Sequence, residues 1–250
     1  MKNREGKTVP SVVFKTRQNN EFVDVSTDSI FKDKTVVVFS LPGAFTPTCS
    51  STHLPRYNEL ASVLKENGVD EIVCISVNDA FVMDAWKENQ EAANVTLIPD
   101  GNGEFSQGMD MLVDKADLGF GKRSWRYSML VKDGVIVKQF IEDDVPGDPF
   151  NVSDADTMLN YINAKAVIPS SASIITRPGC PFCTKAKAVL TEHNVDFEEI
   201  VLGKDASLRS VRAMTGHETV PQVFLDGKLI GGSDELTDYF KLTNRKTVAA

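Results

Sequence analysis

A chain of 250 residues can form one large domain or two ordinary ones. Its 42% hydrophobic and 25% charged residues are typical of a soluble protein, and its net charge of −8 argues against nucleic acid or an anionic membrane as the main partner. No apolar run approaches the roughly 20 residues that span a bilayer, and the N-terminus lacks the apolar core of a secretory signal, so we expect a cytoplasmic protein without a membrane partner.

Apolar patterning predicts alternating strands and helices up to residue 164, an α/β arrangement. The expected strands are at 8–16, 35–40, 71–77 and 95–98, with a turn-rich connection at 24–28. The expected helices are at 50–66, 79–90 and 153–164, the last capped by Ser153. A Lys132-Asp133-Gly134 turn joins strands at 124–131 and 135–140 in a hairpin.

One loop in this half carries a candidate nucleophile. The stretch Pro42-Gly43-Ala44-Phe45-Thr46-Pro47-Thr48-Cys49 connects a strand to a helix, so Cys49 stands where the helix begins. Free N–H groups and the helix dipole stabilise negative charge there and favour the thiolate, the form of cysteine that attacks. Pro42 and Pro47 stiffen the loop, and the Thr46 hydroxyl can donate to and accept from a bound oxygen species. A buried structural cysteine, the common alternative, fits this loop poorly.

This stretch resembles the peroxidatic motif P-x-x-x-T-x-x-C of the peroxiredoxins, and its fuller form, PGAFTPTCS, is similar to the peroxiredoxin 5 branch. The resemblance implies a peroxiredoxin fold and active-site roles for Pro42, Thr46 and Cys49. The segment RYSMLVKDGVIV is similar to the peroxiredoxin stretch whose arginine reaches the reactive cysteine, which implies that role for Arg126. A guanidinium there would favour the thiolate and orient a peroxide oxygen. Arg123 is the competing candidate.

The other cysteine of this half, Cys74, lies inside the strand expected at 71–77. We expect it to pack in the core. The functional alternative is a resolving thiol, but a strand interior limits the access that thiol–disulfide exchange requires. The first half therefore offers no evident disulfide partner for Cys49.

A second series of expected strands and helices begins after a short segment that contains Pro and Ser. We expect a linker at 166–171 between a domain of residues 1–165 and a domain of residues 172–250. The sequence pattern of the second domain predicts the element order βαβαββα, which is the thioredoxin-like layout. Its elements are expected at 172–176, 180–193, 196–202, 206–215, 222–225, 228–230 and 233–242.

Cys180-Pro181-Phe182-Cys183 opens the first helix of this second domain. Cys180 is then the exposed nucleophile at the positive helix end, and Cys183, one turn later, is the second thiol. A zinc half-site is the alternative, but zinc takes four ligands and no second cysteine or histidine pair accompanies these two. We therefore expect no metal.

The CPFC motif differs by one aromatic residue from the CPYC of dithiol glutaredoxins and resembles that family. Thr219-Val220-Pro221 resembles the family's TVP segment with its cis proline, and Gly231-Gly232-Ser233-Asp234 resembles the turn that holds the γ-glutamyl end of glutathione. The glutathione-binding residues implied are Arg177, Phe182, Thr219, Val220, Pro221, Gly232, Ser233 and Asp234. Gly216-His217-Glu218 departs from the basic residue that many glutaredoxins carry, which leaves Lys185 or Arg212 as candidates for a further carboxylate contact.

Together the resemblances imply two thioredoxin-like domains, a peroxiredoxin fold followed by a smaller glutaredoxin fold. They imply that Cys49 reduces hydrogen peroxide and alkyl hydroperoxides, with glutathione as the reducing co-substrate and no bound cofactor. Cys180 then removes glutathione from Cys49, and whether Cys183 first closes a disulfide stays open. Two other classes remain: a protein deglutathionylase that works through Cys180, and a redox sensor in which oxidation of Cys49 changes assembly.

The expected linker also bears on assembly. Six residues limit how far Cys180 can travel toward Cys49 of its own chain. Transfer to Cys49 of a second copy is then favoured, which predicts a homo-oligomer. The sequence does not decide between transfer within and between subunits.

Overall fold

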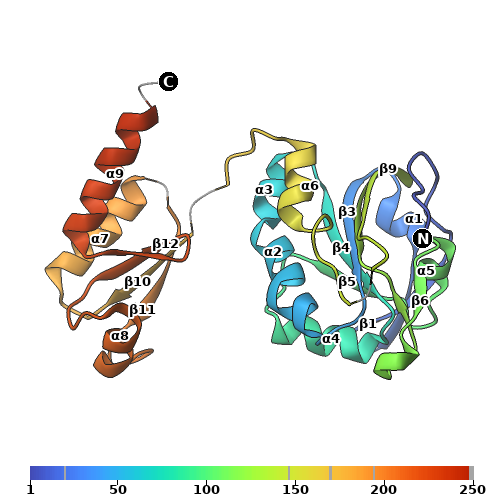
Figure 1. The fold of residues 1–250 in the computed structure, drawn as a ribbon, viewed down its shortest axis with the longest axis horizontal. Coiled ribbons are helices and arrows are strands. Elements are labelled where there is room, and N and C mark those ends of the chain that lie inside the picture. The colour runs from blue at the N-terminus through green and yellow to red at the C-terminus, as the bar shows by residue number, and fades with distance from the viewer. Residues whose placement is uncertain (20, 146, 169–170, 194, 248–250) are drawn as a thin grey trace. The chain divides into compact units, whose positions relative to one another are not determined.

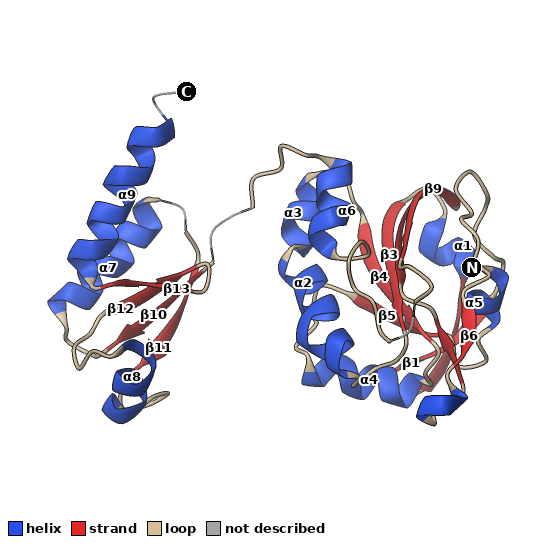
Figure 2. Cartoon of the chain, in the orientation of Figure 1, coloured by secondary structure: helices blue, strands red, loops and turns tan. Residues whose placement is uncertain are grey.

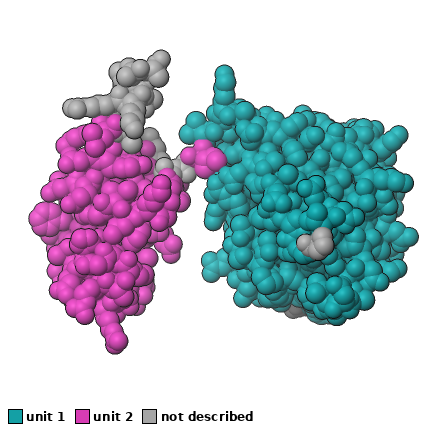
Figure 3. All heavy atoms as spheres, viewed as in Figure 1, with its two compact units in different colours: residues 1–167 teal, residues 168–250 magenta. Residues whose placement is uncertain are grey.

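The computed structural model describes the chain except residues 20, 146, 169–170, 194 and 248–250. The chain divides into two compact units, residues 1–167 and 168–250, drawn in teal and magenta in Figure 3. The division falls inside the segment expected as a linker, of which residues 169 and 170 lie outside the described part. Each unit has its own sheet and core.

The first unit is built on a five-stranded sheet in the order β5-β4-β3-β8-β9 (Figure 1). The central strand β3 (Thr35–Leu41) pairs in parallel with β4 (Glu71–Ser76) and antiparallel with β8 (Tyr127–Lys132). At the edges, β5 (Thr96–Pro99) runs parallel to β4 and β9 (Val135–Ile141) antiparallel to β8.

Helices cover both faces of this sheet. Val37, Phe39 and Leu41 of β3 pack on one side, and Val36 and Val38 pack on the other. The first side is covered by α2 (Leu54–Glu59), α3 (Ala61–Glu66), α4 (Ala80–Asn89) and α6 (Ala155–Ile162). The second side is covered by α1 (Thr27–Phe31) and α5 (Glu104–Gly108). Burial on both faces explains why the central strand is a continuous apolar run.

The helix expected at 50–66 is broken into three pieces. A π-helix, η1 (Cys49–His53), comes first and is followed by α2 and α3. Pro55, in the first turn of α2, has no N–H to donate to a carbonyl one turn earlier. The turn before it is of the wider π type, in which the Leu54 N–H donates to the Cys49 carbonyl.

The predicted cap of the last helix is wrong. Asp154, not Ser153, caps α6, and its carboxylate accepts from the Thr157 N–H at 2.8 Å. The Ser153 hydroxyl instead donates to Glu142 at 2.7 Å, so this residue is taken by a contact distant in sequence.

Two small hairpins complete the unit. β1 (Val13–Gln18) pairs with β2 (Glu21–Ser26), and β6 (Leu112–Asp114) pairs with β7 (Lys122–Ser124), the latter two flanking η2 (Ala116–Leu118). The turn-rich connection expected at 24–28 is therefore wrong: it is the end of β2 and the start of α1, since Asp24 and Ser26 lie on a strand paired with β1.

The second unit has a four-stranded sheet in the order β11-β10-β12-β13. Its strands are β10 (Ala172–Thr176), β11 (Phe197–Val201), β12 (Gln222–Leu225) and β13 (Lys228–Gly231). Figure 2 shows α7 (Pro181–Glu192) and α9 (Ser233–Thr247) together beside the sheet, and α8 (Leu208–Thr215) follows β11. This is the predicted βαβαββα order. Within the described residues, no helix of either unit has the length and apolarity to cross a membrane.

Candidate active sites

Cys49 is the first residue of η1 and follows the loop that leaves β3. Its side chain has no solvent exposure and belongs to the core cluster beneath α2 and α3. The next residue, Ser50, accepts a hydrogen bond from the Trp86 indole at 3.0 Å, which ties this turn to α4. The Cys49 sulfur is therefore shielded from bulk solvent in this arrangement.

The loop before Cys49 is held by its own polar groups. The Thr46 hydroxyl donates to the Gly43 carbonyl at 2.8 Å, and the Ala44 N–H donates to Asn78 at 3.0 Å. Pro42 is buried, and Thr46 is half-buried. Because the Thr46 proton is used within the loop, its oxygen is left to accept a hydrogen bond.

Arg126, which lies between β7 and β8, is the arginine beside Cys49. Its side chain is 1% exposed, and its Nη2 donates to Cys49 Sγ at 3.5 Å. The competing candidate, Arg123, donates to the Val77 carbonyl at 2.7 Å. The geometry thus brings together the arginine and cysteine that the peroxiredoxin resemblance pairs.

The guanidinium of Arg126 also meets a carboxylate and an aromatic ring. Asp148 accepts from Nη2 at 2.6 Å and from Nε at 3.2 Å, and the Phe150 ring centroid lies 5.4 Å from the guanidinium carbon. Burial lowers the pKa of Arg126, but the negative charges of Cys49 and Asp148 outweigh burial and raise it above the ordinary value. Arg126 therefore stays charged inside the core.

A buried histidine that the sequence reading did not single out completes this group. His53 Nδ1 lies 3.0 Å from Arg126 Nη1, and its Nε2 lies 3.2 Å from the Ser153 carbonyl oxygen. Tyr57 donates to the same carbonyl at 3.0 Å. Burial first, and the charge of Arg126 second, lower the pKa of His53 to about 3. The spacing of four residues from Cys49 is the only local signal that could have pointed to it.

Glu142, the residue after β9, holds the backbone of residues 151–153. Its carboxylate accepts from the N–H groups of Asn151, Val152 and Ser153, each at 2.9 Å. Burial raises the pKa of Glu142, but these N–H donors and the Ser153 hydroxyl outweigh it and lower the pKa below its usual value. The backbone carbonyl of Glu142 also accepts from the Trp125 indole at 2.9 Å.

Cys74 lies in the interior of β4, opposite Phe39 of β3, and is fully buried. Burial, with a smaller effect from the charge of Cys49, raises the pKa of Cys74 well above the ordinary thiol value. A neutral, inaccessible thiol packs in the core, as expected, and is poorly suited to resolve a disulfide.

The second site lies at the start of α7. Cys180 is its N-cap, half-exposed, and its sulfur accepts from the Cys183 N–H at 3.2 Å. Its thiol also lies 3.7 Å from the Val220 carbonyl oxygen, beside a Val220–Pro221 bond that is cis, as predicted.

The two thiols of this site differ in acidity. Burial raises the pKa of Cys180, but hydrogen bonds from the Cys183 thiol and N–H outweigh it. The Phe182 N–H and the charge of Arg177 act in the same direction, so the pKa of Cys180 lies below its ordinary value. Burial first, and then the neighbouring Cys180, raise the pKa of Cys183. Cys180 is thus the more acidic thiol.

Three of the residues that resemble a glutathione site act on Cys180: the Val220 carbonyl lies beside its thiol, and the Phe182 N–H and the Arg177 charge lower its pKa. Arg177, Phe182, Thr219 and Asp234 are exposed, Val220 and Gly232 half-buried, and Pro221 and Ser233 buried. Both candidate basic residues already pair with acids: Lys185 with Asp234 at 2.7 Å, and Arg212 with Glu218 at 2.8 Å. These exposed pairs are weak, so a charged ligand can compete for their members.

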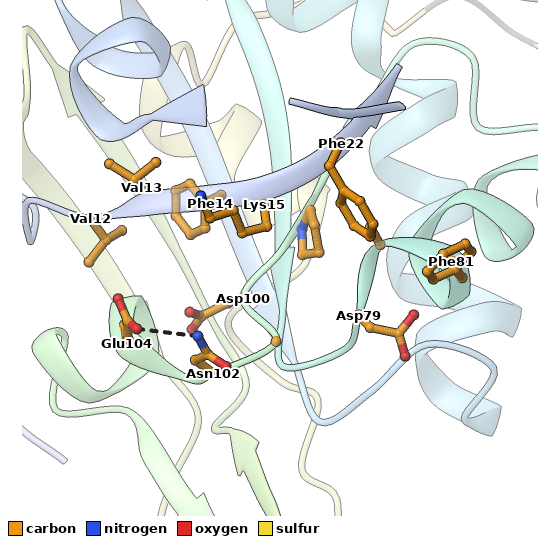
Figure 4. A pocket seen from close by; sticks show the side chains of 13 residues that line it. Val12, Val13, Phe14, Lys15, Phe22, Asp79, Phe81, Asp100, Asn102 and Glu104 are labelled. Carbon is orange, nitrogen blue, oxygen red and sulfur yellow. Dashed lines mark hydrogen bonds between the residues drawn. The ribbon is translucent and has the colours of Figure 1, made fainter. Parts of the chain in front are cut away.

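A separate surface pocket of about 170 Å³ lies between the β1–β2 hairpin and the loop after β5 (Figure 4). Phe22 and Phe81 meet edge to face at its rim, with ring centroids 5.9 Å apart. None of its lining residues is a predicted site residue. Among the described residues, no group of three or more His, Cys, Asp or Glu side chains is placed to hold a metal.

Comparison with known proteins accounts for both units. The Redoxin family model matches residues 4–159, and the Glutaredoxin family model matches residues 172–230. The hybrid peroxiredoxin hyPrx5 of Haemophilus influenzae is 64% identical over 240 residues, which cover 96% of this chain and 100% of that protein. A peroxiredoxin of Synechocystis is 59% identical over 167 residues, 62% of this chain and 88% of the relative.

Solved structures agree for the first unit. The crystal structure of reduced Prx3 from Vibrio vulnificus in complex with hydrogen peroxide aligns with a TM-score of 0.60 at 40% identity, covering 63% of this chain and 98% of that one. The thioredoxin-like fold expected for each half is thereby confirmed, and peroxide reduction by an oxidoreductase of this class is supported. The chain belongs to the peroxiredoxins of the redoxin family and carries a glutaredoxin domain fused after its peroxiredoxin domain.

Proposed function

We propose that this protein is a glutathione-dependent thiol peroxidase for hydrogen peroxide and alkyl hydroperoxides. The observation that carries the proposal is Arg126 Nη2 at 3.5 Å from Cys49 Sγ in a fully buried site. The same chain also holds the Cys180 and Cys183 pair, of which Cys180 is half-exposed. The Cys49 thiolate attacks one peroxide oxygen and the O–O bond breaks. Cys49 becomes a sulfenic acid, and the second oxygen takes a proton and leaves as water or an alcohol.

The neighbours of Cys49 have separate roles in this step. Arg126 donates to the sulfur and to the peroxide oxygens and stabilises the negative charge that moves from one to the other. Thr46, whose proton is held by Gly43, accepts a hydrogen bond from the peroxide. Pro42 is buried at the end of β3 and excludes water from the loop.

Glutathione then restores the thiol in two exchanges. Its thiol condenses with the sulfenic acid to give a mixed disulfide on Cys49 and water. The Cys180 thiolate attacks the glutathione sulfur, so that Cys49 leaves as a thiolate and the glutathione is carried by Cys180. The lower pKa of Cys180 supports it as the attacking thiol.

Two routes can release the glutathione from Cys180. A second glutathione attacks it and yields oxidised glutathione, or Cys183 attacks Cys180, releases glutathione and closes a disulfide. The raised pKa of Cys183 makes it the slower attacker and favours the first route. Peroxide supplies the oxidising equivalents and glutathione thiols supply the reducing ones, so glutathione serves as co-substrate and no bound cofactor enters the scheme.

Peroxide consumption coupled to glutathione and glutathione reductase tests the proposal. Wild type should turn over, and Cys49→Ser should not. Turnover that survives Cys49→Ser would reject Cys49 as the peroxide-reducing residue and leave the glutaredoxin domain as the working part. Cys180→Ser separates the deglutathionylase alternative: loss of protein deglutathionylation with peroxide turnover retained would favour that alternative.

We further propose that exchange occurs between chains of a cytoplasmic homo-oligomer, because the expected linker is only six residues long. Mixing Cys49→Ser with Cys180→Ser chains distinguishes the two cases. Restored turnover indicates transfer between chains. An inactive mixture, formed under conditions in which subunits exchange, indicates transfer within a chain.

A further inference from the structure

The guanidinium of Arg126 has a partner for each of its nitrogens. Nε and Nη2 donate to Asp148, Nη2 also donates to Cys49, and Nη1 faces His53 Nδ1 at 3.0 Å. The guanidinium is rigid and planar, so a partner that fixes Nη1 also fixes where Nη2 points. The scheme above gives His53 no role, although its ring is fully buried beside the reactive cysteine.

Two independent contacts select the same tautomer of His53. The Ser153 carbonyl oxygen only accepts, so the ring nitrogen facing it, Nε2, carries the proton. Arg126 only donates, so the nitrogen facing it, Nδ1, carries a lone pair. A neutral ring with the proton on Nε2 satisfies both.

The ring has little freedom to turn away from this arrangement. Its centroid lies 4.9 Å from that of Phe39, 4.8 Å from that of Phe150 and 5.6 Å from that of Tyr57. The charge that acts on the ring is that of Arg126, whose other nitrogens face Asp148 and Cys49. A proton on Nδ1 would face the guanidinium and be repelled by it.

We propose that His53 is a positioning residue of the Cys49 site, whose neutral Nδ1 holds Arg126 Nη1 so that Nη2 of the same guanidinium faces the Cys49 sulfur. A neutral acceptor suits this position, because a second carboxylate would offset the positive charge that faces the Cys49 sulfur. The role of His53 in catalysis rests on the proposed peroxidase function, but the contact between His53 and Arg126 can be tested without measuring turnover.

Two amide variants separate the contacts of the ring. The side-chain oxygen of His53→Asn lies near the Nδ1 position and can accept from Arg126. The amide nitrogen of His53→Gln lies near the Nε2 position and can donate to Ser153, but Gln leaves Arg126 Nη1 without its acceptor. Tyr57→Phe is the matched control, because it removes the other hydrogen bond to the Ser153 carbonyl and leaves Arg126 untouched.

The readout is the alkylation rate of Cys49 by iodoacetate relative to iodoacetamide, measured on the Cys49 peptide in the full chain. A guanidinium at the sulfur attracts the anionic reagent, whereas general loosening speeds both reagents alike. The ratio should fall about fivefold or more in His53→Gln, and His53→Asn and Tyr57→Phe should stay within about twofold of wild type. Equal ratios in the two amide variants would overturn the proposal.

A second measurement uses the unaltered protein. Nitrogen-15 NMR at neutral pH should show His53 as the neutral tautomer protonated on Nε2. Protonation on Nδ1, or an imidazolium, would refute the positioning role even if the variants fold poorly. A wild type without peroxidase turnover would instead defeat the proposed function and leave both of these results intact.

Discussion

Mild acid should weaken the first unit through His53. Burial and the charge of Arg126 lower the pKa of this ring to about 3 in the folded chain. In the unfolded chain the ring is solvated and has a pKa of about 6.5. Lowering the pH from about 6.5 toward about 3 should therefore protonate the His53 ring in the unfolded chain but not in the folded one.

The sign and size follow from linkage. Above about pH 6.5 the ring is neutral in both the folded and the unfolded chain, so His53 has no effect on the free energy of unfolding. Between about pH 6.5 and about pH 3 the ring takes up a proton in the unfolded chain but not in the folded one. The free energy of unfolding therefore falls as the pH falls through this range. For these two pKa values, the free energy of unfolding drops by about 2 kcal/mol between about pH 7 and about pH 5.

Cys74 gives an assay for the first unit alone. Its side chain is fully buried in β4, so a pulse of a thiosulfonate reagent in urea labels it only when that sheet unfolds. Labelling is measured on the Cys74 peptide at both pH values for wild type and for His53→Asn. Wild type should lose about 2 kcal/mol more than the variant, which lacks the titrating ring.

The comparison cancels groups that titrate in both proteins. Parallel loss of stability in wild type and His53→Asn would refute the reasoning, because it would mean that His53 takes up its proton in the folded unit as readily as in the unfolded chain. A larger loss in the variant would refute it as well.

Three further outcomes are expected. Arg126→Lys should slow oxidation of Cys49 by hydrogen peroxide about a hundredfold in stopped-flow competition, because an ammonium cannot meet Asp148 and the sulfur together; a rate within threefold of wild type would contradict this. Glu142→Gln should lower the unfolding free energy by about 1–3 kcal/mol, since the amide cannot accept all the N–H groups that the carboxylate accepts, and an unchanged melting temperature of the first unit would count against it. Cys74→Ala should keep peroxide turnover within about threefold, because the thiol only packs, and a loss of tenfold or more would assign it a redox role.

The candidate reactive residues have signals that are local in the sequence. Cys49 and Thr46 lie in one loop, and Cys180 and Cys183 lie one turn apart in one helix. In the second unit, the strands expected at 172–176 and 222–225 match β10 and β12 to the residue. A Pro or Gly lies within three residues of each end of these short strands, which helps to locate their ends from the sequence.

The support of the Cys49 site could not be predicted in this way. Asp148 reaches Arg126 across 22 positions, and the Ser153 carbonyl reaches His53 across 100. No periodicity or spacing encodes such contacts, because the sheet order and the path of the chain after β9 create them. The wrong helix cap has the same origin: Ser153 and Asp154 both suit a cap, and Glu142 takes the serine.

The two tryptophans of the chain provide an intrinsic fluorescence probe of the first unit. Trp86 and Trp125 are its only tryptophans, and both lie in the first unit. Trp86 donates to the residue after Cys49, and Trp125, next to Arg126, donates to the carbonyl of Glu142. Oxidation at Cys49 should therefore alter intrinsic fluorescence, whereas exchange between Cys180 and Cys183 takes place in a domain without a tryptophan. Intrinsic emission from the unlabelled full chain should thus report on the proposed Cys49 site alone.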